Sequence, residues 1–170
     1  MRGMGRRWLR GDRGRGRFGG SQGGRAGRWA GRDKTPAEPW AAALVGTQNS
    51  AEEHVTDALT ASTLGSGDVA VLATPIVLGL AERAAVGALA GKLPEGRTTV
   101  GASVQLQHSA PTPVGVTVRA EVRVEAAQGN RLLFGVRVTD PAGEVARGRI
   151  VRAVVDRAEF ERSATDRTPR

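Results

Sequence analysis

The sequence lacks cysteine, has only two histidines and contains no long apolar run. Without cysteine, the chain cannot form disulfides, use a thiolate nucleophile or bind a metal ion through sulfur. Two histidines alone do not favour a structural zinc site, so we predict neither a bound metal nor another cofactor. Because no run of about eighteen residues is apolar, the sequence also predicts a soluble protein with no membrane partner.

The net charge of +8 comes entirely from the first 40 residues. Residues 1–40 hold 11 lysines and arginines against 3 acidic residues, whereas residues 41–170 hold 14 of each kind. The first segment is rich in arginine and glycine and has no apolar period, so we predict a disordered tail. It is either a solvated extension or a weak tether for RNA or single-stranded DNA. The Arg6-Arg7 pair lacks the apolar segment of a secretory signal, so a cytoplasmic location is expected.

One folded domain is predicted over residues 41–163, followed by a frayed C-terminus at residues 164–170. Prolines 36 and 39 mark its first boundary. Residues 44–56 offer a first strand, in which His54 is expected to be an ordinary surface residue.

A helix is predicted to begin at Thr74-Pro75, in the run T-P-I-V-L-G-L-A-E-R-A-A-V. Threonine can cap a helix and proline suits its first turn, so Thr74 is either an N-cap or a functional hydroxyl. Glu82 has apolar and small neighbours at helical spacing, so it points where the apolar side chains point. Such a carboxylate is either half of a structural ion pair with an arginine or a general acid or base. Thr74 and Glu82 are eight positions apart, which would separate them by roughly 12 Å along a helix.

Four strand-like runs follow without another helix. In residues 99–109 every second residue from Val100 to Leu106 is apolar, and His108 is the next residue in this alternation. His108 is therefore expected on the face that covers the helix and Glu82, either as a core histidine or as the acid–base partner of Glu82. The earlier members of this alternation are Val100, Ala102, Val104 and Leu106.

Residues 116–125 and 131–139 alternate in the same way, and a last strand is expected at residues 144–155. One helix followed by these strands predicts an α+β fold in which an antiparallel sheet wraps around one long central helix. A single chain would leave part of that layer uncovered, so a homodimer or higher oligomer is expected. The inward residues are predicted to be Val116, Val118, Ala120, Val122, Val124, Leu132, Phe134, Val136 and Val138.

Two stretches carry a family resemblance: V-L-A-T-P-I-V-L-G-L-A-E-R-A-A and T-T-V-G-A-S-V-Q-L-Q-H-S-A-P-T-P-V-G. Over about residues 44–160 the chain resembles hotdog-fold thioesterases of the fluoroacetyl-CoA thioesterase type. The resemblance implies the hotdog fold, an acyl-CoA substrate and a catalytic threonine, glutamate and histidine, which would be Thr74, Glu82 and His108. It further implies substrate-binding positions at Gly101 and Arg152.

The implied reaction is hydrolysis of a small or short-chain acyl-CoA to the free acid and CoA. Glu82 would be the nucleophile or the base that activates water, and His108 would protonate the leaving thiolate. Thr74 would hydrogen-bond the carboxylate or serve as nucleophile, and backbone N–H groups near Gly101 or a helix start would hold the oxyanion. Two other functions fit a hotdog protein: acyl-CoA binding without turnover, and hydration or dehydration of an enoyl-CoA.

Two departures from the family pattern concern the substrate. Gly65 and Asp68 stand where the fluoroacetyl-CoA enzyme has lid phenylalanines. The last strand reads G-R-I-V-R at residues 148–152, where relatives tend to have G-T-H-E-R. The resemblance therefore implies thioester hydrolysis and leaves the acyl group unspecified.

Overall fold

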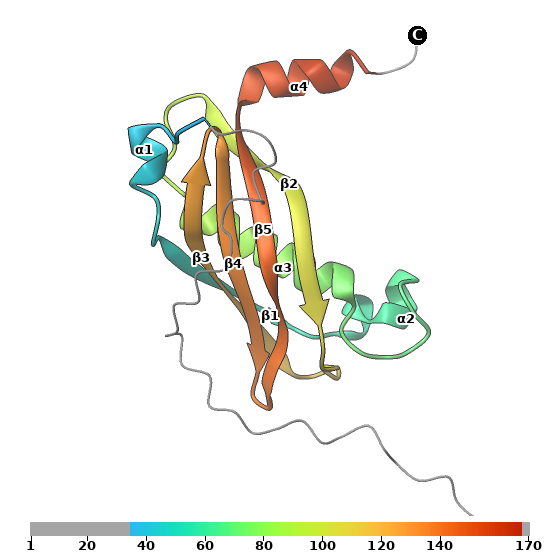
Figure 1. The fold of residues 1–170 in the computed structure, drawn as a ribbon. Coiled ribbons are helices and arrows are strands. Elements are labelled where there is room, and N and C mark those ends of the chain that lie inside the picture. Colours follow the sequence, from blue (N-terminus) through green and yellow to red (C-terminus); the bar gives the residue numbers. More distant parts are fainter. Residues whose placement is uncertain (1–34, 168–170) are drawn as a thin grey trace, which may run out of the picture.

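The computed structural model describes residues 35–167 of the chain. Residues 1–34 of the predicted tail lie outside the described residues, and Ala37 and Trp40 already pack against the core. The elements follow in the order shown in Figure 1: α1 (Pro39–Ala42), β1 (Gln48–His54), the 3-10 helix η2 (Asp57–Leu59), α2 (Ala61–Leu64), α3 (Thr74–Ala88), β2 (Arg97–His108), β3 (Thr117–Gln128), β4 (Arg131–Asp140), β5 (Gly143–Asp156) and α4 (Arg157–Thr165).

The five strands form one antiparallel sheet in the order β1-β3-β4-β5-β2. Helix α3 lies against one face of this sheet, so the predicted α+β arrangement of a sheet around one central helix is confirmed (Figure 1). Strands β1 and β2 are the two edges, and the last residues of β2 approach the start of α3.

Helix α3 buries a stripe of small and aliphatic side chains at the spacing of an amphipathic helix. Alanines dominate this stripe, so the sheet can approach the helix axis closely. The helix ends at Ala88, and the chain then turns through Gly91, whose φ of 69° favours glycine. The buried residues of α3 are Val77, Leu80, Ala81, Ala84, Ala85 and Ala88.

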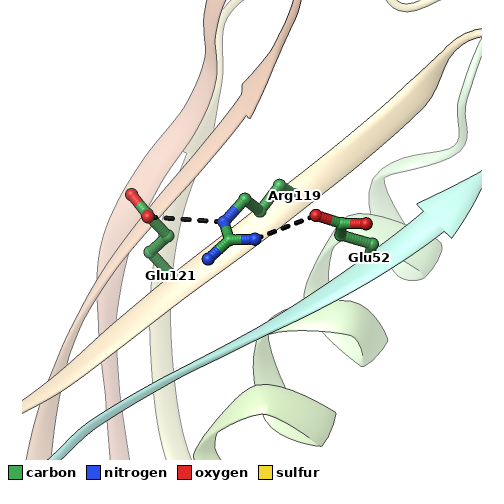
Figure 2. Close-up of polar contacts among 3 residues, drawn as sticks. All are labelled: Glu52, Arg119 and Glu121. Carbon is green, nitrogen blue, oxygen red and sulfur yellow. Dashed lines mark hydrogen bonds and ion pairs between the residues drawn. The ribbon is translucent and has the colours of Figure 1, made fainter.

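Strands β3 and β4 confirm the predicted alternation. Their inward residues are buried from Val118 to Val124 and from Leu132 to Val138 in steps of two, and Val116 is half-buried just before β3. The outward residues of β3 from Arg119 to Glu125 are charged. Among them Arg119 contacts Glu52 Oε1 of β1 at 2.9 Å and Glu121 Oε1 at 3.4 Å, as Figure 2 shows. These exposed pairs mark the outer face as a solvated surface.

Strand β2 departs from regular alternation at Ala102. Gly101 pairs with Arg152 and Ser103 pairs with Val151, so one extra residue of β2 lies between two consecutive residues of β5. This β-bulge reverses the phase of everything beyond it, because successive residues of a strand point to opposite faces.

Because of the bulge, only some of the β2 residues predicted to face the helix do so. Val104 pairs with Ile150 of the buried face, and Leu106 and His108 follow in the same phase, so these three lie on the helix side as predicted. The prediction for Val100 is wrong. Val100 pairs with Ala153 on the opposite face, because it precedes the bulge.

Helix α4 projects beyond the end of the sheet and buries none of its residues (Figure 1). Asp156 begins it by accepting a hydrogen bond from the N–H of Glu159 at 2.9 Å. The helix ends at Thr165, so residues 164 and 165 of the segment predicted to fray are helical, whereas residues 168–170 lie outside the described residues. None of the helices within residues 35–167 is long and apolar enough to cross a membrane.

Candidate active site

The first part of the candidate site joins the start of α3 to the end of β2. Thr74 Oγ1 and His108 Nδ1 lie 2.9 Å apart, although 34 positions separate the two residues in the chain. Thr74 is the first residue of α3 rather than its N-cap, which is Ala73 and makes no side-chain hydrogen bond. Of the two alternatives for Thr74, the N-cap is therefore wrong, and its hydroxyl contacts an imidazole instead.

The surroundings of His108 favour its neutral form. Its Nε2 atom is buried and has no hydrogen-bond partner among residues 35–167. Burial lowers the pKa of His108 below its ordinary value, and the backbone of Ala110 opposes this only in part. A neutral imidazole whose Nδ1 faces a hydroxyl can accept the proton of that hydroxyl.

The second part of the site is an ion pair between Glu82 and Arg152. Glu82 Oε1 lies 3.1 Å from Arg152 Nη1, with 36% of the glutamate side chain and 6% of the arginine side chain exposed. Arg152 also donates from Nε to Thr99 Oγ1 at 3.0 Å and from Nη2 to the Thr99 carbonyl at 2.8 Å. The ion-pair alternative for Glu82 is thus realised. The predicted contact between Glu82 and His108 is not formed within the described chain.

Gly101 lets the carboxylate of Glu82 approach the backbone of β2. A Cβ atom at this position would overlap Glu82 Oε1, so any larger residue would displace the carboxylate. Burial lowers the pKa of Arg152, and the charge and hydrogen bond of Glu82 oppose that effect. The guanidinium still carries its charge at neutral pH, since arginine does not lose its proton in proteins. Arg152 thus holds Glu82 through Oε1, and Oε2 makes no hydrogen bond or ion pair within residues 35–167.

The two parts of the site lie apart within one chain. Thr74 and Glu82 are eight positions apart on α3, which corresponds to roughly 12 Å along the helix axis. Along β2, the stretch from Gly101 to His108 spans about 20 Å. The structure therefore divides the predicted residues into a Thr74–His108 pair and a cluster of Glu82, Gly101 and Arg152.

Sequence reasoning did not find Thr99. Its hydroxyl and its carbonyl both accept from Arg152, so it anchors the arginine that holds Glu82. Thr99 lies two positions before Gly101 on the same strand face. Gly101 is the residue that pairs with Arg152, whereas Thr99 pairs with Val154, so the arginine reaches Thr99 diagonally across the β2–β5 ladder. Within residues 35–167, no group of three or more His, Cys, Asp or Glu side chains could hold a metal ion.

Comparison with known proteins places this arrangement in a family. The model of the fluoroacetyl-CoA-specific thioesterase family matches residues 55–158, which include all the candidate site residues. The chain belongs to this family. It is 33% identical over 99 residues to the fluoroacetyl-CoA thioesterase of Streptantibioticus cattleyicolor, and the match covers 58% of this chain and 71% of that enzyme.

Solved structures agree with the sequence comparison. A structure of a fluoroacetyl-CoA thioesterase superposes with a TM-score of 0.69 and 29% identity, covering 74% of this chain and 97% of that one. A hot-dog-like protein from Thermanaerovibrio acidaminovorans gives a TM-score of 0.68 at 29% identity, covering 74% and 93% of the two chains. A thioesterase superfamily member from Thermus thermophilus gives 0.67 at 27% identity, covering 72% and 93%. The fold is therefore the hotdog fold, as the sequence predicts.

Proposed function

We propose that this acyl-CoA thioesterase hydrolyses a small or short-chain acyl-CoA to the free acid and CoA, using Thr74, Glu82 and His108. The observation that carries the proposal is the 2.9 Å contact between Thr74 Oγ1 and His108 Nδ1. A hydroxyl beside a neutral imidazole is the arrangement of an activated nucleophile and its base. Membership of the fluoroacetyl-CoA-specific thioesterase family supports the thioester substrate class.

In the proposed reaction, Thr74 Oγ1 attacks the thioester carbonyl carbon while His108 Nδ1 takes the hydroxyl proton. Collapse of the intermediate breaks the C–S bond, and His108 returns the proton to the departing sulfur to give the free thiol of CoA. A water molecule that loses its proton to Glu82 then attacks the threonine ester. The acid leaves, and the proton held by Glu82 restores the threonine hydroxyl.

The distance between the two parts of the site favours an active site shared by two copies of the chain. Within one chain Glu82 lies roughly 12 Å along the helix from Thr74, too far to activate water at the same ester. The carboxylate of Glu82 is partly exposed, and the neighbouring edge strand β2 exposes Val104 at 41%. A symmetric homodimer would set Glu82 of one copy against Thr74 and His108 of the other, giving two equal sites.

A panel of short-chain acyl-CoAs with detection of released thiol tests the function. Thr74→Val keeps the shape of the side chain and removes the nucleophile, so turnover should fall at least 100-fold, on the order of a lost catalytic group. Thr74→Ser retains the hydroxyl and should keep most of the activity. Binding of acyl-CoA without thiol release would favour the non-catalytic alternative. Consumption of enoyl-CoA without thiol release would favour a hydratase.

Mixing two inactive variants tests the shared site. In a mixed dimer of Thr74→Ala and Glu82→Gln, a shared arrangement leaves one site with both residues intact and one site with both replaced. Random mixing in equal amounts should therefore recover about a quarter of the wild-type activity. If Thr74 and Glu82 acted from the same chain, every site would carry one replacement and no activity would return.

A further inference from the structure

The loop after β2 connects the two residues of the Thr74–His108 pair through the backbone. Just after His108, the N–H groups of Ser109 and Ala110 donate to the carbonyl of Val145 at 2.9 and 3.3 Å. The same loop continues to Thr112, whose carbonyl accepts the N–H of Leu72 at 2.9 Å, two residues before Thr74. Residues 109–112 are thus hydrogen-bonded to Val145 of β5 just after His108, and to Leu72 just before Thr74.

The side chain of Thr112 fixes this loop to the turn between β4 and β5. Thr112 is fully buried, and its Oγ1 donates to Asp140 Oδ2 at 2.9 Å. The other oxygen of Asp140 accepts the N–H groups of Ala142 and Gly143 at 2.8 and 3.1 Å. The carboxylate is therefore held by its own turn, and it offers the threonine a fixed, charged acceptor.

We infer that Thr112 and Asp140 are positioning residues for the reaction, because they set the distance between the Thr74 hydroxyl and the His108 imidazole. The inference rests on the proposed function of that pair. A nucleophile and its base must be held within about 0.5 Å of their productive geometry, and small displacements lower the rate strongly. The carbonyl of Thr112 restrains the segment that leads into α3, and the hydroxyl of Thr112 restrains the loop after β2.

The same loop also shapes the electrostatics of the imidazole. The backbone of Ala110, which lies in this loop, raises the pKa of His108, whereas burial lowers it more strongly. A loosened loop would admit water to the imidazole. The pKa of His108 would then move up toward its ordinary value, and the acid limb of the rate profile would move with it.

The test compares Thr112→Val with Thr112→Ser in the full-length protein. Valine keeps the shape but removes the donor and leaves Asp140 Oδ2 without its partner, whereas serine keeps the hydroxyl. We expect kcat for thiol release to fall about tenfold or more in Thr112→Val, with KM nearly unchanged and the acid limb of the pH profile at higher pH. Thr112→Ser should stay within about twofold of the wild type in kcat.

Two further variants separate positioning from stability. Val124→Ala truncates a fully buried residue of β3 and should lower the melting temperature without changing kcat. Asp140→Asn keeps one oxygen for the turn and loses the charged acceptor, so it should lower kcat in the same direction as Thr112→Val. If Thr112→Val does not fold, kcat of Asp140→Asn tests the inference in its place.

The inference is overturned if Thr112→Val loses stability as Val124→Ala does but keeps its kcat and pH profile. It is equally overturned if Thr112→Ser is as slow as Thr112→Val, because the hydroxyl would then be irrelevant. A wild-type protein that releases no thiol from any acyl-CoA would instead refute the proposed function, and the positioning role with it.

Discussion

Replacing Glu82 by glutamine separates the chemical role of the carboxylate from its role beside the buried Arg152. Glutamine has nearly the same shape and can still accept from Arg152 Nη1, which lies 3.1 Å from Glu82 Oε1. The variant therefore loses the negative charge and the basicity while it keeps one hydrogen bond. If Glu82 deprotonates water, turnover should fall 100-fold or more, which corresponds to about 2.7 kcal/mol in the activation barrier.

The expected cost in stability is smaller. A charged hydrogen bond contributes about 1.5–3 kcal/mol and a neutral one about 0.5–1.5 kcal/mol, so the exchange should cost about 1 kcal/mol. The full penalty for stranding a buried charge is not expected, because the glutamate side chain is 36% exposed and glutamine still pairs with the arginine. For a domain of this size the melting temperature should fall by about 4 °C.

Both quantities are measured on the same preparation, as thiol release from an acyl-CoA and as the thermal midpoint at the same pH. Glu125→Gln is a matched control, because Glu125 pairs with Arg149 at 3.0 Å and is 37% exposed but lies on the outer face of the sheet. It should change neither the rate nor the midpoint appreciably. A Glu82→Gln enzyme with a lowered midpoint and a rate within about threefold of the wild type would refute the catalytic role.

The site leads to four further expectations. Because burial lowers the pKa of His108 below 6.5, the acid limb of kcat/KM should lie below pH 6.5. Just below pH 6.5 the unfolded chain binds more protons at His108 than the folded chain does, so stability should also fall as the pH drops below 6.5. Thermal midpoints measured over this pH range should show the loss in the wild type but not in His108→Asn. Gly101→Ala should lower kcat about tenfold, because the added methyl group displaces Glu82. The control is Gly67→Ala, whose methyl group meets Ala61 at 3.4 Å and which should leave kcat within about twofold of the wild type. Equal rates for the two variants would contradict the close approach of Glu82 to Gly101. Light scattering should give a dimer or larger species, and an active monomer would exclude the shared site.

The fold could be predicted from the sequence because local patterns encode it, and the same patterns together with the family resemblance pointed to the candidate site residues. The alternation in β3 and β4 depends on successive side chains, and the helical run from Thr74 depends on spacing within one element. The pairing of side chains could not be predicted in the same way. Glu82 pairs with Arg152 instead of His108, because the register between β2 and β5 places Arg152 opposite Gly101. His108 lies at the other end of β2, where it contacts Thr74.

The bulge at Ala102 makes the candidate site sensitive to the number of residues in β2. Gly101 and His108 are seven positions apart, and in a regular strand an odd separation would point them to opposite faces. The one unmatched residue brings both to the helix side. Deleting Ala102 would restore regular alternation and turn His108 away from Thr74, whereas substituting it would leave the parity intact. Between these two positions, the protein should tolerate changes of residue type far better than the gain or loss of a single residue.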